Sequence, residues 1–404
     1  MTTDPAHTLS PALAAIAERL HGLPGEAHRV VSPLGVWLLL ARVARAAEGE
    51  TGDLDVALGM PRARAVELAD RLVGSPHPVV LDAFAAWVRE EWRTDAVRAF
   101  FDALPGDVTS GTMPTQREAD AWASEKTDGL ITEYPLSLGS GVLITLANAL
   151  ATRVGWIEPF RTVPAGGSDG LGAGPFAGAV TRALVAAPGV GHGAWLASSP
   201  IGPVAVHVAR AEGLDVWSVI ADPAAQPREV LRTAYALVAG NAPPLPLSSL
   251  PLGDGPAWTI EEIRATASPA ERRTGRVASV TVPAWSARAT LDLTADPALG
   301  FPAAGDVLGA LLGRPGLELL AVQSAVARYH RVGFEAAAVT AIAMRTSAVI
   351  HEEGPLRVAR LRFGHPYAAV AVARPTPGRG GGEDPWDGIP VFSAWVAAAE
   401  EPQD

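Results

Sequence analysis

The hydrophobic pattern near the N-terminus has the spacing of a helix. Ser10-Pro11 predicts a helix start, because Ser is a favoured N-cap and Pro a favoured first helical residue. Four apolar residues that follow fall on one helical face: Leu13, Ile16, Ala17 and Leu20. We therefore expect an amphipathic helix that begins at Ser10 and packs on the core.

Two further helix starts follow in the first third of the chain. Ser32-Pro33 repeats the start signal, and the apolar run 36–43 after it predicts a buried helix that ends near Gly49. The segment 115–118, TQRE, has the pattern of a capping box and predicts a third helix, which ends at Gly129. The first third of the chain is therefore expected to be rich in helices.

The rest of the chain has a different pattern. Short segments rich in Val, Thr and other β-branched residues predict strands at 141–156, 202–210, 215–222 and 277–293 and in three segments after residue 354. Helices are expected at 227–240 and 303–313. Helices early and strands late indicate an α+β fold rather than alternating βαβ units.

Composition and charge narrow the classes of partner. The chain has 404 residues, and 48% of them are hydrophobic, which suits a globular protein with a large core. The 32 Lys and Arg against 43 Asp and Glu give a net charge of -11, without a basic block. Such a chain is a poor nucleic-acid binder. We see no internal repeat and no clear domain boundary, so we expect one domain over 1–404.

Several kinds of chemistry are excluded or disfavoured. The chain has no cysteine, so disulfides, thiolate metal sites and Cys nucleophiles are excluded. The N-terminal segment lacks the basic and apolar regions of a secretory signal, and no apolar run is long enough to cross a membrane. We therefore expect a cytoplasmic protein that does not bind a membrane, although secretion by another route stays open.

Enzyme-like motifs are weak. The nine histidines form no pair with metal-ligand spacing and carboxylate support, so neither a metal nor another cofactor is expected. His192 lies among glycines in GVGHGAW (189–195), which favours a solvent-exposed turn over a phosphate loop. Ser32 is interpreted as a helix cap, and no GxSxG motif exists. The sequence therefore disfavours an enzyme without excluding one.

The segment Val332–Met344, VGFEAAAVTAIAM, needs a different explanation. An Ala-rich run usually predicts a helix, but this one has no stripe of large apolar residues. It also contains Val, Thr and Ile, which favour strands. A run of small side chains with strand propensity is therefore expected here.

Blocks along the whole chain resemble the conserved blocks of the serpins, in order and in spacing. They are Ser32-Pro33-Leu34 with Gly49-Glu50-Thr51, Leu146–Ala149 with Gly155–Phe160, Val282-Pro283 with Leu299-Gly300, the strand 322–333, His365-Pro366-Tyr367, and Ile389–Phe392. The resemblance implies the serpin fold. That fold is α+β, with a helix-rich N-terminal part, a large mixed central sheet, smaller sheets and an exposed reactive-centre loop.

The resemblance also implies roles for particular residues. Residues 332–354 would form the reactive-centre loop, with the hinge at Gly333, Phe334, Glu335, Ala336, Ala337, Ala338, Val339, Thr340 and Ala341. In an inhibitory serpin a protease cuts the loop, and the hinge then enters the large sheet as a new strand. Alternate residues of that strand face the core, where a large side chain costs about 1–3 kcal/mol. Residues expected to line the region that parts are Ser32, Asn148, Trp156 and Gln323.

The sequence departs from the serpin pattern where the loop begins. Phe334 stands where the family has Thr or Ser, and a core packed for a hydroxyl has no void for a ring. Arg331 replaces a glutamate, Gln323 a histidine, and Gly35 a small polar residue on the buried helix. Together these departures favour slow insertion or none.

The loop is also several residues longer than usual, so the position of its scissile bond stays open. The candidate region is Met344, Arg345, Thr346, Ser347 and Ala348. Family spacing from Gly333 places the bond at Ser347-Ala348, whereas a bond after Met344 or Arg345 suits common proteases better.

Two hypotheses about function follow. The first is a monomeric serpin-type inhibitor whose partner is a serine or cysteine protease. The second is a non-inhibitory protein of serpin fold that binds, or conceivably transforms, a small molecule in a pocket lined by some of the eleven Trp residues. The small residues Ala336 to Ala338 favour the first hypothesis, and Phe334 and Arg331 favour the second.

Overall fold

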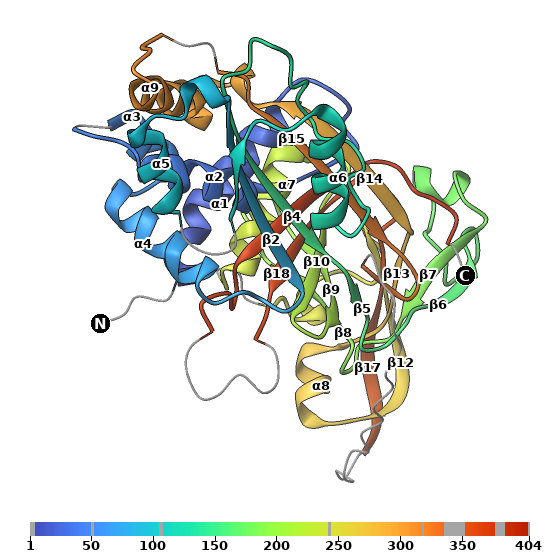
Figure 1. The fold of residues 1–404 in the computed structure, drawn as a ribbon. Coiled ribbons are helices and arrows are strands. Elements are labelled where there is room, and N and C mark those ends of the chain that lie inside the picture. Colours follow the sequence, from blue (N-terminus) through green and yellow to red (C-terminus); the bar gives the residue numbers. More distant parts are fainter. Residues whose placement is uncertain are drawn as a thin grey trace.

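The helices form most of the N-terminal part, as the sequence predicts. The computed structural model describes residues 5–49, 52–104, 108–240, 244–316, 319–334, 352–375 and 384–402. Its helices are α1 (Pro5–Gly22), α2 (Pro33–Ala44), α3 (Gly52–Leu58), α4 (Arg62–Val73), α5 (Asp95–Asp102), α6 (Gln116–Lys126), α7 (Pro227–Val238), α8 (Pro269–Thr274) and α9 (Phe301–Leu311). Several of them gather at one end of the molecule, where α1 and α2 lie among α3, α4, α5 and α9 (Figure 1).

The helix starts agree with the sequence in two cases of three. Ser32 caps α2 by accepting a hydrogen bond from the backbone N–H of Gly35, and Thr115 caps α6 in a complete capping box. The predicted start at Ser10 is wrong, because α1 already begins at Pro5 and Pro11 lies inside the helix. A proline at the first turn costs no hydrogen bond, so Pro5 supplies the start that was assigned to Pro11.

Two six-stranded sheets form the C-terminal part of the fold. The first, which we call the β9 sheet, has the order β1 (Arg29–Val31), β19 (Pro390–Val396), β18 (Tyr367–Ala373), β10 (Leu214–Ile220), β9 (Val204–Ala211) and β8 (His192–Ala197). The second, the β17 sheet, has the order β11 (Gly253–Asp254), β12 (Trp258–Ala267), β17 (Glu352–Arg362), β13 (Arg276–Val282), β7 (Arg182–Ala186) and β6 (Arg161–Pro164). Strands β18 and β19 are buried throughout, which explains why all their residues but Ser393 are apolar.

The remaining strands form two separate ladders. One has the order β3 (Val108–Thr112), β2 (Val80–Val88) and β4 (Ile144–Thr152). The other has the order β14 (Trp285–Asp292), β15 (Val322–Tyr329), β16 (Gly333–Phe334) and β5 (Val154–Gly155). β5 follows β4 along the chain after Arg153, so the two ladders meet at β4–β5 and together form the central sheet.

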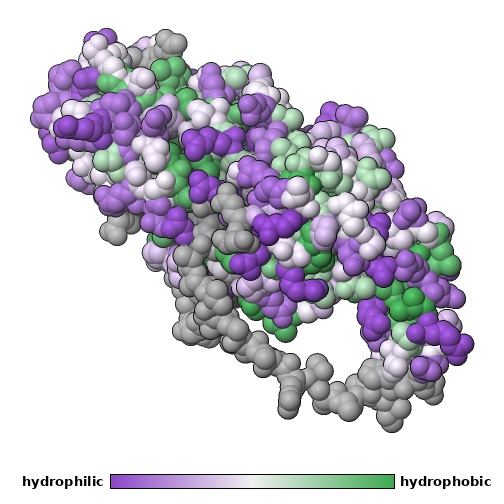
Figure 2. Space-filling model, turned by 90° about the vertical axis from the view of Figure 1, so that its right-hand side faces the viewer, coloured by the Kyte–Doolittle hydropathy of each residue, from purple (hydrophilic) through white to green (hydrophobic). Residues whose placement is uncertain are grey.

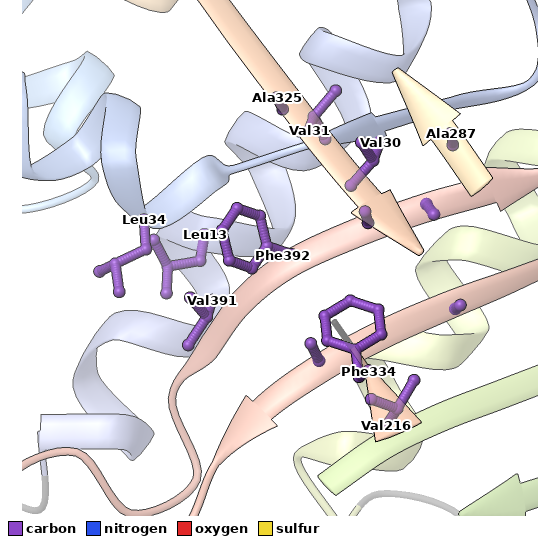
Figure 3. Close-up of a cluster of buried hydrophobic side chains, with 14 of the residues drawn as sticks. Leu13, Val30, Val31, Leu34, Val216, Ala287, Ala325, Phe334, Val391 and Phe392 are labelled. Atoms are coloured by element: carbon purple, nitrogen blue, oxygen red, sulfur yellow. The ribbon is translucent and has the colours of Figure 1, made fainter. Parts of the chain in front are cut away.

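A large apolar core lies between the central sheet, α2 and the β9 sheet. Every residue of α2 except Leu39 is buried, which matches its sequence, apolar apart from Arg42. Figure 3 shows part of this core, where Leu34 of α2 and Phe392 of β19 lie beside Leu13 of α1, and Ala325 of β15 lies beside Val31 of β1. Within the described ranges, no helix is long and apolar enough to cross a membrane.

The surface is mixed in character. On the face shown in Figure 2, hydrophobic residues lie in small groups among hydrophilic ones. A surface of this kind is normal for a globular protein and does not by itself mark an interaction site.

Candidate functional site: a strand-wide opening in the central sheet

The central sheet is open between β4 and β15. Among the described residues no ladder joins these two strands, although both line one cavity of about 510 Å³. β4 contributes residues 144–150 to its wall, and the segment 319–324 that leads into β15 contributes the other side. Over residues 144–150 of β4 and 322–324 of β15, the edges that face the opening therefore have no strand partner among the described residues.

The opening is closed at one end by β16. Gly333 pairs with Gly155 and Phe334 with Val154 of β5, and Phe334 also pairs with Tyr329 of β15. β16 is antiparallel to both neighbours and fills the position between them. The hinge that the sequence indicates thus begins inside the sheet, at the end of the opening.

Phe334 is already buried, with an exposed fraction of 3%. Its ring packs edge-on against Trp285, with ring centroids 6.3 Å apart, and lies toward Val216 of β10 (Figure 3). The expected lack of room for a ring at this position is not observed, because the core offers an aromatic and aliphatic pocket instead of a site for a hydroxyl. Phe334 is therefore no steric obstacle to the first step of insertion.

Gln323 fastens the β15 side of the opening to the start of α2. Its side-chain Nε2 donates to the backbone oxygen of Ser32 at 2.8 Å, and its Oε1 accepts from the backbone N–H of Ser32 at 3.0 Å. The Ser32 hydroxyl donates in turn to the backbone oxygen of Val391 on β19 at 3.0 Å. Glutamine can form this pair of hydrogen bonds with one backbone residue because its side-chain amide is both donor and acceptor.

Gly35 explains how close α2 comes to β4. A Cβ added at Gly35 would lie 3.0 Å from Oδ1 of Asn148 and 3.1 Å from Oγ of Ser32. A larger residue would therefore have to displace the side chains of Asn148 and Ser32 by a few tenths of an ångström. Three of the residues assigned to the parting region (Ser32, Asn148 and Gln323) line the cavity together with Gly35.

A buried ion pair fastens the β4 side and was not foreseen from the sequence. Nη2 of Arg42 on α2 lies 2.6 Å from Oδ2 of Asp82 on β2, and both side chains are less than 10% exposed. Asn148 of β4 donates through Nδ2 to Oδ1 of Asp82, and the guanidinium of Arg42 lies over the ring of Phe84 at 4.5 Å. Each side of the opening is thus anchored to α2 separately.

The opening is covered on both faces of the sheet. Residues of α2, such as Val36 and Leu39, line it from the side of the core. Trp122 and Ala123 of α6 and the following residues 134–137 and 141–143 line it from the other side. A strand that enters the opening would therefore pass between α6 and α2.

Trp156, the fourth residue assigned to the parting region, lies at the hinge instead of in the cavity wall. It is 3% exposed, and its indole Nε1 donates to the backbone oxygen of His330 at 2.9 Å. The backbone N–H groups of Trp156 and Phe160 donate to the oxygens of Val332 and Arg331. Residues 156–160 thus hold the turn that leads into β16, and we call them the hinge seat.

Several predicted site residues lie outside the described ranges. These are Glu335, Ala336, Ala337, Ala338, Val339, Thr340 and Ala341 of the hinge and Met344, Arg345, Thr346, Ser347 and Ala348 of the candidate scissile region. The described chain resumes at Glu352, which begins β17, so residues 352–354 belong to that strand.

His192 does not lie in a solvent-exposed turn, so that prediction is wrong. It is 2% exposed, begins β8 and stacks on His207 of β9. The glycines beside it serve close packing, since a Cβ at Gly191 would lie 2.5 Å from Cβ of Glu158. Within the described ranges, no group of His, Asp or Glu has the arrangement of a metal site.

Comparisons with solved structures give a consistent result. The fold is similar to the thermophilic serpin tengpin in its native state (TM-score 0.61, 12% identity, 97% of this chain and 94% of that chain). It is also similar to human thyroxine-binding globulin complexed with thyroxine (0.64, 14%, 98% and 100%) and to Serpin48 of the insect Tenebrio molitor (0.59, 16%, 99% and 100%). No family model and no curated protein matches the sequence.

These similarities span nearly the whole length of both chains in each comparison. The identities are too low to transfer an activity, and the solved structures include proteins named as serpins and a thyroxine-binding globulin. The elements described above, with an open central sheet, a hinge strand at its end and two further sheets, are those that the resemblance in sequence implies. The chain therefore has the serpin fold.

Proposed function

We propose that this protein is a protease inhibitor that acts by inserting its cleaved loop into the central sheet, with a serine or cysteine protease as its partner. The observation that supports this function best is the continuity of β16 with the opening. β16 ends at Phe334, and the next residues of the chain would continue directly between β4 and β15. An antiparallel strand in that position would supply the missing partners of both edges.

The register of β16 assigns a place to each following residue. If the pairing of Phe334 with Val154 and Tyr329 continues, Ala336 comes to lie between Thr152 and Ala327. Since Phe334 points into the core, every second residue after it does so too. The inward series is then Ala336, Ala338, Thr340, Ile342 and Met344. The small side chains come first, next to the buried Thr152 and Ala327.

Polar and charged groups match in the same register. Thr340 would lie between Asn148 and Gln323, which offer hydrogen-bonding side chains at the wall of the cavity. Glu335 would lie on the outer face between Arg153 and Arg328, both of which are exposed. A carboxylate between two guanidinium groups is a favourable arrangement at a surface, although a modest one.

The length of the opening favours one scissile bond. In this register Met344 reaches Ile144, the first residue of β4. Residues 345–347 would then connect the inserted strand to the trapped protease, which supports cleavage at Ser347-Ala348. Cleavage after Met344 would leave no such connection, because the last inserted residue would itself be bound to the enzyme.

The proposed function is tested by cutting the loop of the purified protein with a nonspecific protease and comparing melting curves. Insertion should raise the melting temperature markedly, because the loop becomes a central strand. Incubation with trypsin- and subtilisin-like proteases should also give a covalent complex that survives SDS. No gain in melting temperature after verified cleavage would refute insertion. A gain without a complex would support insertion but refute inhibition of the proteases tested.

A second candidate function is that of a small-molecule carrier. The observation that favours it is the cavity itself, whose volume of about 510 Å³ lies in the range of ligand pockets and whose wall contains no charged side chain among the described residues. An uncharged apolar dye such as N-phenyl-1-naphthylamine should then quench the fluorescence of Trp122, which lines the cavity, and Trp122→Phe should remove the quenching. Unchanged quenching in the variant would place the dye elsewhere.

A further inference from the structure

Two buried histidines lie directly behind the hinge seat. His192 on β8 and His207 on β9 stack with ring centroids 5.4 Å apart, and their exposed fractions are 2% and 0%. Phe160 of the hinge seat packs against both rings, at 4.5 Å from His192 and 5.7 Å from His207. The proposed inhibitory mechanism uses neither imidazole.

The hydrogen bonds of the pair assign the protons of both rings. Nε2 of His192 lies 2.8 Å from the backbone oxygen of Glu158, which can only accept, so Nε2 of His192 holds a proton. A neutral His192 then accepts at Nδ1, and Nε2 of His207 donates to it over 3.2 Å. Nδ1 of His207 is left without a proton and, in the described part of the chain, without a hydrogen-bond partner.

This chain of bonds has no place for an additional proton. Protonation of His192 would put an N–H against the N–H of His207. Protonation of His207 would put a new donor at Nδ1, where it meets no acceptor. Burial lowers the pKa of both imidazoles, and the neighbouring His192 and Arg210 lower the pKa of His207 further. The pair is therefore neutral at pH 7.

The charged and titratable groups around the pair come from several elements. Glu158 of the hinge seat favours a charged His192, whereas Arg210 of β9 disfavours charge on both rings. Phe160 also packs against Tyr329 of β15, and Phe363 packs against both His207 and Tyr367 of β18. The two tyrosine hydroxyls stay neutral, because burial raises their pKa well above the ordinary value. Glu158 is exposed and cannot neutralise a buried charge on His207.

We propose that the His192–His207 pair stabilises the hinge seat only while both rings are neutral, and that a proton taken up by the pair releases Gly333 and Phe334 from β5. The link is short. The Glu158 oxygen that accepts from His192 lies between Trp156 and Phe160, whose N–H groups hold Val332 and Arg331. When the pair separates, Phe160 of the hinge seat loses its packing against one or both rings, and the two-residue pairing of β16 with β5 loses part of its support.

The proposal extends the proposed function, because it concerns the hinge of the same loop, but its test needs no protease. Hydrogen–deuterium exchange is measured on the full chain at pH 7.5 and 5.0, with rates corrected for the intrinsic effect of pH. Protection of residues 155–160 and 330–334 should fall about tenfold at pH 5.0. From the ordinary pKa of 6.5, uptake of one proton limits this loss to about 30-fold.

The matched variant is His192→Gln with His207→Gln, which keeps side-chain donors and acceptors but cannot titrate. Its protection should be the same at both pH values, while the exposed His7→Gln should behave as the wild type. An unchanged wild type would overturn the proposal. So would an equal fall in the double variant, because the loss would then come from another group, such as His330.

The double variant could fail to fold, so a second measurement uses the unaltered protein. Nitrogen NMR of the imidazoles distinguishes the two neutral tautomers and the cation. Both His192 and His207 should be neutral and protonated at Nε2 at pH 7.5. A cation, or a proton at Nδ1 of either ring, would contradict the chain of bonds on which the proposal rests. The proposed function is tested separately, by the loop-cleavage and melting experiment described above.

Discussion

The side-chain amide of Gln323 holds the backbone N–H and the backbone oxygen of Ser32 at once, at 3.0 and 2.8 Å. The Ser32 oxygen also accepts from Val36 as part of α2, whereas no other acceptor is found for the Ser32 N–H in the described part of the chain. Loss of the amide would therefore leave a buried donor without a partner.

Gln323→Leu should lower the free energy of unfolding of the intact protein by about 1–3 kcal/mol, the usual cost of one unsatisfied buried group. Chemical denaturation measures it. The control is Ser324→Ala on the same strand, whose hydroxyl bonds to the exposed Thr290 and to no other group in the described part of the chain. This control should change stability by less than about 0.5 kcal/mol. Equal losses in the two variants would contradict the role given to the amide.

Phe334→Ala should destabilise the intact protein by about 3 kcal/mol, at the lower end for a buried Phe, because β16 can partly relax. The same denaturation experiment measures the loss. Val56→Ala, at a position that is 78% exposed, serves as the control and should have almost no effect. If Phe334→Ala were as stable as the wild type, the ring would not be seated in the core in solution.

The register of insertion can be tested with two adjacent alanines. Ala338→Arg would place a charge toward the core and should abolish the gain in melting temperature after loop cleavage. Ala337→Arg would place the same charge on the outer face and should retain most of that gain. Differential scanning calorimetry of the intact and cleaved forms gives both numbers. The opposite order of effects would shift the register by one residue.

Arg42→Leu should lower the free energy of unfolding by about 3–5 kcal/mol, because it leaves the buried Asp82 with an uncompensated charge. The double variant with Asp82→Leu should recover part of that loss, since both charges are then gone. For comparison, removal of Arg98, which pairs with the exposed Asp95, should cost about 1 kcal/mol or less. Additive losses in the double variant would show that Arg42 and Asp82 do not interact.

The free energy of unfolding is expected to depend on pH through His21, which forms a hydrogen bond with the hydroxyl of the buried Ser393. Burial is the main cause that lowers its pKa from 6.5 to about 3, with Arg29 contributing. The unfolded chain then binds a proton first as the pH falls, so stability present above pH 6.5 is lost towards pH 3, by up to about 1.4 kcal/mol per pH unit. His21→Phe should remove the contribution of one proton to the slope of unfolding free energy against pH, whereas His7→Gln, at an exposed position, should leave the slope unchanged. An equal slope in His21→Phe and the wild type would show that His21 is charged in the fold.

Much of the fold could be predicted from the sequence, because its signals are local. The cap at Ser32, the capping box at Thr115 and the β-branched strands depend on neighbouring residues. The resemblance in blocks then supplied the overall arrangement, which the comparisons confirm as the serpin fold. The false start at Ser10 shows the limit of such signals, since two prolines in one helix compete for the same role.

The site was less predictable, because its parts meet only in three dimensions. Arg42 lies in an apolar run and shows its role only through Asp82, which is 40 positions away. The sequence predicts Phe334 to be an obstacle, because the pocket that holds its ring is formed by Trp285 and Val216 from distant strands. The glycines around His192 predict a turn. In the structure Gly191 is needed instead because Glu158, from a distant segment, packs where its Cβ would lie.

The open central sheet also affects how the protein behaves in a concentrated solution. β4 and β15 present two facing rows of backbone donors and acceptors, and any extended segment with small side chains can pair with them. The sequence from Ala336 to Ala341 has mostly small side chains, and every molecule has both this sequence and the opening between β4 and β15. Self-association should therefore rise with concentration and with heating, and it should yield linear chains of molecules rather than closed pairs.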